Sequence, residues 1–286
     1  MIGIKRKGIL LSLFFIISAL CPALADVPGS LPAASSYASE GLSYEDETIS
    51  VSITQGRAYE TDYWVARIKL SEPGQLRTAS ARGFDANRTV RGLTLAARVN
   101  AVLAINGDYF SYIPDGYLIR NGVQYRDLPS GKRDVLLIDD RGDFYQLPMA
   151  AREDIDAFSG NPIMNSFNFG PALVIDGIRV EEFFENNNAA FKPRQRMAIA
   201  QVKRGSLEYV AVACAGPRGR NTGLTLEEFS RLVYEQGVEN AYNLDGGNST
   251  MLMFKGAYVN TGDLGNIRDI SDIIYFVSTH DEGEAK

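Results

Sequence analysis

Histidine is almost absent from this sequence of 286 residues, and the only one, His280, lies in a polar stretch after the last strand-like segment. A Ser-His-Asp triad, a zinc site with histidine ligands and general-base catalysis by histidine all need this side chain inside a folded site. The sequence therefore excludes these mechanisms. Any catalysis has to use carboxylates, arginine, lysine, tyrosine, amides or a bound ion.

Cysteine is nearly as rare, with Cys21 and Cys214 as the two copies. Cys21 lies in a segment that we expect to be removed, so the mature chain has no intramolecular disulfide. Cys214 follows the apolar Val212 and Ala213. Unpaired cysteine in such a context is typically a small buried hydrophobe, and we predict that role here.

Long apolar runs are limited to residues 9–20. This run is shorter than the roughly 20 residues that cross a bilayer. It follows Lys5, Arg6 and Lys7 and precedes an Ala-Leu-Ala sequence at 23–25, the order of a secretory signal peptide. We predict that residues 1–25 are a signal peptide and that the protein is secreted or lies in the cell envelope, with no integral membrane segment after cleavage. An uncleaved anchor and a lipoprotein signal are the alternatives.

Positive charge is also scarce. The chain has 29 basic and 35 acidic residues, and loss of Lys5, Arg6 and Lys7 leaves 26 basic residues and a net charge of -9. An acidic protein is repelled by polyanions. Nucleic acid and anionic membranes are therefore poor partners.

Three regions follow the expected cleavage site. Residues 26–43 are rich in proline, alanine, serine and glycine and predict a flexible leader. Residues 44–279 carry the strand and helix patterns of one folded domain. Residues 280–286 are a polar tail.

Alternation of apolar and polar residues, or short apolar runs, predicts most of the domain as strands. The segments are 48–55, 62–70, 101–105, 135–138, 143–147, 171–176, 197–202, 207–214, 241–244, 250–254, 257–259 and 272–277. Asn121-Gly122 between two apolar runs predicts a type I′ hairpin over 117–125. The fold class expected from this pattern is α+β, a single strand-dominated mixed domain with two or three helices packed on the sheet.

Two helices are predicted. Residues 90–100 place apolar side chains on one face, and residues 225–236 begin with a capping box formed by Thr225 and Glu228. Gly237 should end the second helix because glycine accepts the left-handed conformation that follows a helix.

Two polar clusters each follow a predicted strand, where loops commonly hold functional groups on a rigid support. The first is residues 106–110 (NGDYF) and the second is residues 243–250 (NLDGGNST). The second combines amides, a carboxylate, hydroxyls and two glycines, which suits a ligand rich in hydroxyl groups. We expect both clusters to converge on one pocket, with Tyr112 as a candidate for its rim.

The segments INGDYF, NLDGGNSTM, FGPALVIDG at 169–177 and RMAIA at 196–200 resemble the phosphodiester glycosidase family. This family includes the uncovering enzyme, an N-acetylglucosamine-1-phosphodiester alpha-N-acetylglucosaminidase, and many exported bacterial proteins. The resemblance extends from about Tyr63 to Val277. It departs from the family pattern at Asp108, at Gln195 and Met197 around the matching Arg196, and at Asn248.

The resemblance implies an exported hydrolase that cleaves the glycosyl-phosphate bond of a sugar-1-phosphodiester, in an envelope or extracellular polysaccharide or a small glycoconjugate. Phosphate is a weakly basic leaving group, so such a site needs cations more than a strong general acid. Asp245 is the first candidate for base or nucleophile and Asp108 the second. The predicted substrate-binding residues are Asn106, Arg196, Asn243, Gly246, Gly247, Asn248, Ser249, Thr250 and Arg268.

Two alternatives remain open at this stage. The chain could be a non-catalytic carbohydrate-binding or exopolysaccharide-assembly module, because a fold does not establish turnover. It could also be a phosphodiesterase in which Asp108 and Asp245 hold Ca²⁺ or Mg²⁺ with asparagine carbonyls. No cofactor is required by the glycosidase mechanism.

Overall fold

The computed structural model describes residues 26–183, 191–260 and 267–280. The predicted signal peptide lies outside these ranges, and so does most of the polar tail. Within them, the helices are too short or too polar for any to cross a bilayer.

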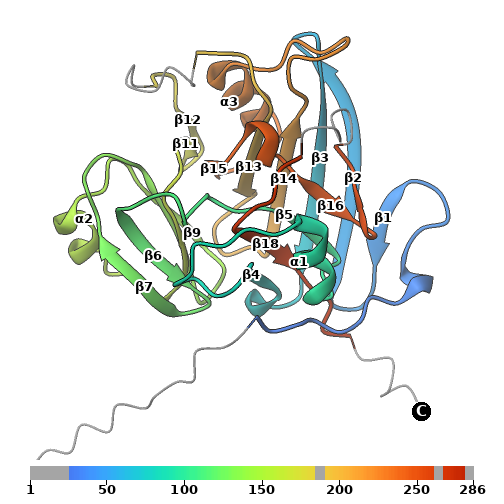
Figure 1. Ribbon diagram of the computed structural model, residues 1–286, viewed down its shortest axis with the longest axis horizontal. Coiled ribbons are helices and arrows are strands. Elements are labelled where there is room, and N and C mark those ends of the chain that lie inside the picture. The colour runs from blue at the N-terminus through green and yellow to red at the C-terminus, as the bar shows by residue number, and fades with distance from the viewer. Residues whose placement is uncertain (1–25, 184–190, 261–266, 281–286) are drawn as a thin grey trace, which may run out of the picture.

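The largest sheet has eight strands in the order β1-β2-β3-β14-β13-β15-β11-β12, and all its pairings are antiparallel. Its outer half, behind the other elements in Figure 1, is built on the long hairpin of β2 and β3. The bounds are β1 Leu42–Glu45, β2 Ile49–Ala58, β3 Thr61–Leu70, β11 Ala172–Ile175, β12 Ile178–Arg179, β13 Arg196–Gln201, β14 Glu208–Cys214 and β15 Asn240–Leu244.

A second sheet of five strands, in the order β17-β16-β5-β18-β4, faces the first. One hydrophobic cluster joins them: Ile199 and Leu244 come from the large sheet, and Ile105 and Phe276 come from the small one. The bounds are β4 Leu76–Ser80, β5 Leu103–Asn106, β16 Leu252–Phe254, β17 Ala257–Tyr258 and β18 Asp272–Phe276. The main core therefore lies between the two sheets.

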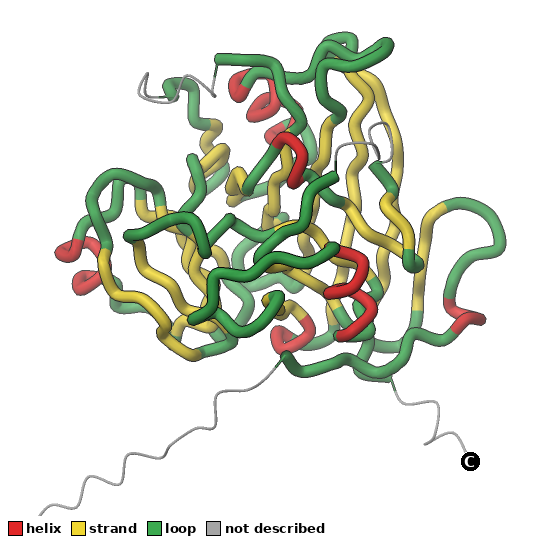
Figure 2. Tube along the Cα trace, in the orientation of Figure 1, coloured by secondary structure: helices red, strands yellow, loops and turns green. Residues whose placement is uncertain are grey.

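Two smaller β units pack beside this core (Figure 2). One is a three-stranded sheet in the order β10-β8-β9, and the other is the hairpin β6-β7. Asn121 and Gly122 turn that hairpin with φ of 49° and 78°, which confirms the predicted I′ geometry. The bounds are β6 Gly116–Arg120, β7 Val123–Leu128, β8 Val135–Asp139, β9 Phe144–Leu147 and β10 Ile163–Phe167.

The described residues form three α-helices: α1 Gly92–Arg98, α2 Arg152–Ala157 and α3 Leu226–Tyr234. Helix α3 covers the face of the large sheet that points away from the second sheet, and Phe229 and Val233 fill that interface. The Thr225 hydroxyl accepts a hydrogen bond from the Glu228 amide, so the predicted capping box is formed. Helix α1 packs on the second sheet through Leu95.

Strands outnumber helices throughout, so the expected α+β class is confirmed. Strands β1, β4, β10 and β12 and helix α2 were not predicted. In β4 the reason is visible in its sequence, LRTAS, because Thr78 and Ser80 are polar residues that are nevertheless buried.

Residues 26–43, expected to be a flexible leader, contact the body of the protein in the structure. Gly29 and Ser30 donate backbone hydrogen bonds to the carbonyls of Val99 and Ser278. Tyr37 packs edge-on against Phe254 with ring centroids 5.4 Å apart. Contacts with the body of the protein therefore begin well before residue 44.

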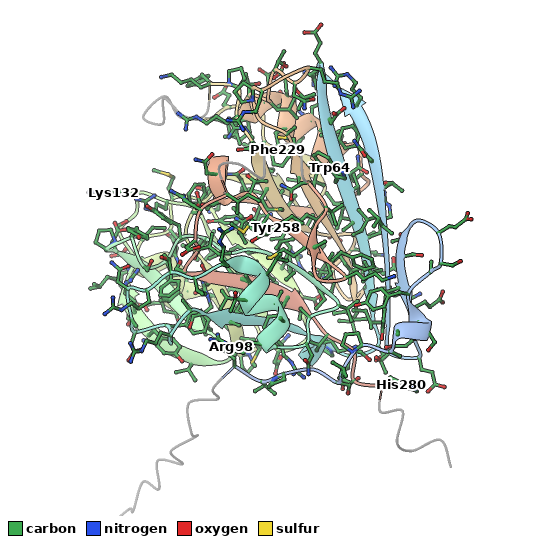
Figure 3. All side chains as sticks on the ribbon, turned by 45° about the vertical axis from the view of Figure 1, so that its right-hand side comes forward. Trp64, Arg98, Lys132, Phe229, Tyr258 and His280 are labelled. Atoms are coloured by element: carbon green, nitrogen blue, oxygen red, sulfur yellow. The ribbon has the colours of Figure 1, made fainter. Side chains whose placement is uncertain are left out.

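Figure 3 shows which labelled side chains lie inside the molecule and which lie at its edge. Trp64 and Phe229 are buried, whereas His280 lies at the edge of the molecule near Glu47. Cys214 is fully buried, and burial raises the pKa of its thiol to about 12. Its predicted role as a small hydrophobe is confirmed.

Candidate active site

The candidate site lies where β13 begins and β15 ends. These two strands are antiparallel, with Met197 opposite Leu244, so the adjoining Arg196 and Asp245 belong to the same edge of the sheet. Side chains alternate along a strand, so Asn243 and Asp245 share one face. That face carries α3, because Ala241, two residues earlier, packs in the same cluster as Phe229.

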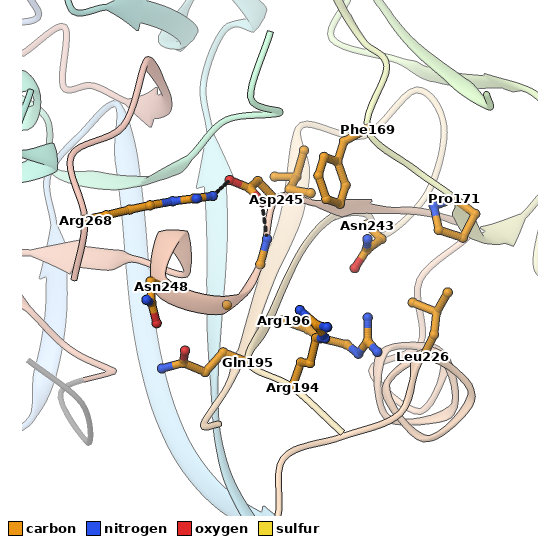
Figure 4. A pocket seen from close by; sticks show the side chains of 13 residues that line it. Phe169, Pro171, Arg194, Gln195, Arg196, Leu226, Asn243, Asp245, Asn248 and Arg268 are labelled. Carbon is orange, nitrogen blue, oxygen red and sulfur yellow. Dashed lines mark hydrogen bonds and ion pairs between the residues drawn. The ribbon is translucent and has the colours of Figure 1, made fainter. Parts of the chain in front are cut away.

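A cavity of about 400 Å³ opens at this edge (Figure 4). This volume is within the range of small-molecule sites in proteins. Seven of the predicted site residues line it: Arg196, Asn243, Asp245, Gly246, Gly247, Asn248 and Arg268. The second motif and the two predicted arginines are therefore brought together.

The other residues of the wall were not predicted from the sequence, and they are Phe169, Pro171, Arg194, Gln195, Leu226 and Leu244. In Figure 4, Phe169 and Pro171 lie above Arg194 and Arg196. Arg194 had a signal in the sequence, since it lies two residues before Arg196 in an extended segment and extended residues at this spacing share a face.

Asp245 is the carboxylate of the cavity, with its side chain 11% exposed. Its Oδ1 accepts a hydrogen bond of 2.9 Å from the Gly246 amide, and its Oδ2 accepts one of 2.8 Å from Nη2 of Arg268. Burial raises the pKa of Asp245, and the hydrogen bonds from Ser249 and Arg268 oppose that rise. A carboxylate with a raised pKa in a cavity is a typical catalytic base or nucleophile.

Arg268 holds several groups around Asp245. Its Nε donates to the Ser249 hydroxyl at 2.5 Å, and its guanidinium lies over the Tyr109 ring at 5.0 Å. Tyr109 in turn stacks on Tyr112 at 4.2 Å and 12°. Tyr112, the predicted rim residue, is half-exposed on the far side of this stack.

Arg196 is 7% exposed and is fixed by the backbone of its neighbours. Its Nε donates to the Leu224 carbonyl at 2.8 Å, and its Nη2 donates to the Lys192 carbonyl at 3.1 Å. Burial lowers its pKa to about 10. Since this is far above neutral pH, Arg196 is a permanent cation in the wall.

Asn106 ties the two motif loops together and is not part of the cavity wall. Its Nδ2 donates to the Asp245 carbonyl at 2.7 Å, and its Oδ1 accepts from the Met251 amide at 3.1 Å. Asn106 thus joins the two loops, but no residue of the first cluster, 106–110, lines this cavity.

Asp108 lies outside the cavity wall as well. It is 1% exposed, with Oδ1 accepting from Nη2 of Arg120 at 2.7 Å and Oδ2 accepting from the Asn168 amide at 2.8 Å. The structure therefore does not bring the two predicted acids into one cavity. Asp108 instead neutralises a buried arginine.

Arg120 is fully buried and also contacts Asp272 at 3.4 Å, while its guanidinium lies 4.3 Å from the Phe167 ring centre. Burial, together with repulsion from Asp108, raises the pKa of Asp272 to about 7, and Arg120 opposes that rise. These three charged residues link β6, β18 and the first motif loop.

Ser249 and Thr250, two of the predicted substrate-binding residues, do not line the cavity. Ser249 is fully buried and accepts from Arg268. The Thr250 hydroxyl is buried too, and no described residue bonds it.

The residues present do not fit the proposed Ca²⁺ or Mg²⁺ site. Both oxygens of Asp108 are bonded, one of them by Arg120, and Arg268 occupies Oδ2 of Asp245. In the described ranges no three acidic, histidine or cysteine side chains converge on one point. A divalent cation needs several free oxygens, and here guanidinium groups take them.

Together these features define a two-sheet α+β domain with one polar cavity that sets a single carboxylate beside several arginines. The chain belongs to the phosphodiester glycosidase family, whose family model matches residues 99–277. The match includes both motif loops and every residue of the cavity wall.

Among curated sequences, the chain is similar to the SPbeta prophage-derived uncharacterized protein YomE of Bacillus subtilis strain 168, at 28% identity over 219 residues. The match covers 73% of this chain and 32% of the relative. The chain thus spans about a third of the length of that curated relative.

Two solved structures share the fold. The catalytic domain of zebrafish N-acetylglucosamine-1-phosphodiester alpha-N-acetylglucosaminidase, auto-inhibited by its pro-peptide, has a TM-score of 0.63 at 18% identity, covering 82% of this chain and 85% of that one. A hypothetical protein from Synechocystis has a TM-score of 0.59 at 17% identity, covering 80% and 62%. At these identities the likeness concerns the fold alone.

Proposed function

We propose that this protein is an exported glycosidase that hydrolyses the glycosyl-phosphate bond of a sugar-1-phosphodiester. The observation that carries the proposal is the placement of one buried carboxylate, Asp245, in the same cavity as Arg194, Arg196 and Arg268. Family membership and the activity in the name of the zebrafish structure agree with it.

The chemistry requires both kinds of group. Breaking the bond between the sugar carbon and the phosphate oxygen leaves positive charge on the sugar ring and negative charge on the departing phosphate. Arginine bonded to that phosphate stabilises the charge that develops on it. No histidine is needed, which suits a chain whose one histidine is at its edge.

Asp245 is the group that acts on the sugar carbon, either as nucleophile or as the base that activates water. Arg268 lowers the pKa of Asp245 and so counters the effect of burial. Gly246 and Gly247 have no side chains, so a sugar can approach the backbone beside Asp245. Asn243 and Asn248 supply further polar groups along the wall.

The substrate that we propose is a sugar phosphate within an envelope or extracellular polysaccharide, or a small glycoconjugate. The prediction of a signal peptide supports a location outside the cytoplasm, where such polymers occur. Because the chain is acidic, it is repelled by nucleic acid, which is therefore a poor partner.

Product analysis in ¹⁸O-labelled water tests the proposal with a methyl phosphodiester of N-acetylglucosamine or glucose as the substrate. Cleavage of the sugar C–O bond gives a free sugar that carries the label and an unlabelled methyl phosphate. A labelled phosphate product would show P–O cleavage and a phosphodiesterase. No product with either sugar, at protein concentrations that bind it, would favour the non-catalytic module.

A further inference from the structure

The three arginines of the cavity differ in what their guanidinium groups already do. Arg268 donates to Asp245 and Ser249, and Arg196 donates to the carbonyls of Leu224 and Lys192. Arg194 is exposed, and its guanidinium makes no hydrogen bond or ion pair to any residue that the structure describes. Of the three, it is therefore the one ready to bind an incoming anion.

The backbone of Arg194 is nevertheless held firmly. Its amide donates to the Leu224 carbonyl at 3.0 Å, and its carbonyl accepts from the Leu224 amide at 3.1 Å and from Sγ of Cys214 at 3.5 Å. Gly223 packs so closely here that a Cβ on it would lie 2.8 Å from the Arg194 nitrogen. The side chain is thus unengaged while its attachment point is fixed, which lowers the entropy lost on binding.

The segment that carries Arg194 is also joined to the loop of Asp245. The Gly247 amide donates to the Gln195 carbonyl at 2.9 Å, and a Cβ on Gly246 would approach that same carbonyl to 2.7 Å. The backbone of Arg194 and the loop of Asp245 are therefore fixed in position relative to each other. In Figure 4, Arg194 and Asp245 lie on different sides of the cavity, with Arg194 near Arg196 and Leu226.

We propose that Arg194 binds the phosphate of the substrate at the mouth of the cavity, while Arg196 and Arg268 act as positioning residues. This inference rests on the proposed function. Because Asp245 is buried and Arg194 is exposed, the sugar lies inside next to Asp245 and the phosphate lies at the mouth. The alcohol esterified to the phosphate then points to solvent, so the site selects the glycosyl phosphate half of the substrate.

The first experiment measures binding of glucose 1-phosphate and of inorganic phosphate to the full-length mature protein by calorimetry. Arg194→Ala should weaken both by about tenfold or more, because it removes a charge-assisted bidentate contact. Lys192→Ala is the matched control: Lys192 is an exposed cation two residues away that does not line the cavity. It should change binding less than twofold. Equal effects of both variants, or no binding to the wild type, would overturn the proposal.

The second experiment separates this inference from the proposed function. Turnover of a methyl phosphodiester should fall strongly in Arg194→Ala, whereas turnover of a neutral aryl glycoside should change little, because its leaving group needs no phosphate contact. Arg194→Lys should restore part of the loss. If the wild type hydrolyses the diester and Arg194→Ala is unimpaired, the inference fails while the function stands. If phosphate binding depends on Arg194 but no diester is hydrolysed, the function fails while the inference stands.

The third experiment varies the alcohol. Methyl, octyl and oligosaccharide phosphodiesters of one sugar should give kcat/KM values within about fivefold of one another if the alcohol lies in solvent, since each 1.4 kcal/mol of contact would change the ratio tenfold. A strong preference for one alcohol would place that group inside the cavity and contradict the assignment of Arg194 to the mouth.

Discussion

Arg268 and Asp245, 23 residues apart in the chain, form an ion pair of 2.8 Å at the wall of the candidate site. The pair does two things at once. It lowers the pKa of a buried carboxyl against the effect of burial, and it fixes the segment before β18 against the second motif loop, since the Arg268 amide also donates to the Asn248 carbonyl.

Asp245→Asn should lower turnover of the sugar phosphodiester by at least about 10²-fold, because the base or nucleophile is lost while the size of the side chain is kept. The circular dichroism spectrum should match that of the wild type. Asp140→Asn, at an exposed position outside the cavity, serves as the control and should be fully active. Near-normal turnover in Asp245→Asn would remove Asp245 from the mechanism.

Arg268→Ala should move the acidic limb of the pH-rate profile to higher pH. Arg268 lowers the pKa of Asp245, so its removal leaves burial to raise that pKa without opposition. If Asp245 acts in its ionised form, activity then disappears at a higher pH as the medium is acidified. Arg268→Lys keeps the charge and should shift the limb less. An unchanged limb in Arg268→Ala, with only a lower plateau, would limit Arg268 to a structural role.

Arg196→Lys should harm phosphodiester substrates more than an activated aryl glycoside. Lysine keeps the positive charge but cannot bond the carbonyls of Leu224 and Lys192 together, so the segment that carries Arg194 loosens. The ratio of kcat/KM for the two substrates, measured in wild type and variant, checks this expectation. An equal fall in kcat/KM for both substrates would show that Arg196 has no part in phosphate binding.

In Asp272→Asn, the free energy of unfolding should decrease less than in the wild type as pH rises. The folded-state pKa of Asp272 is raised from 3.8 to about 7, so between these values the folded protein holds a proton that the unfolded chain releases. The unfolding free energy contributed by this group therefore decreases as pH rises from about 4 to 7. Thermal melts of wild type and variant across that interval give the comparison. Parallel curves would show that Asp272 keeps its ordinary pKa in the fold.

The mature protein should begin at Asp26 and be found outside the cytoplasm, as the signal-peptide pattern predicts. The side chain of Asp26 accepts from the Ser80 amide at 3.3 Å and pairs with Arg98, so this residue is part of the fold. N-terminal sequencing of exported material decides the matter, and retention of Met1 would contradict cleavage.

The sequence by itself determined the local structure of several strands and helices, and it identified the polar residues of the second loop as a candidate site. Alternation in β2 buries Ile49, Val51 and Ile53, and the Thr225 capping box starts α3 where the pattern predicts it. These features depend on neighbours within a few residues, so they can be predicted from spacing. Residues 243–248, Arg196 and Arg268 were also named as candidates, with only Arg196 of the two arginines taken from the family resemblance.

Only the tertiary structure decided what each charged side chain does. Asp108 and Asp245 each follow a strand within a polar motif. Asp108 is bonded by Arg120 and Asn168, which come from other segments of the chain, whereas Asp245 lines a cavity. Arg194 and Arg196 lie two residues apart, but only Arg196 donates to two backbone carbonyls. The accessibility and the partners of a charge are set by segments far away in the chain, and no local pattern encodes them.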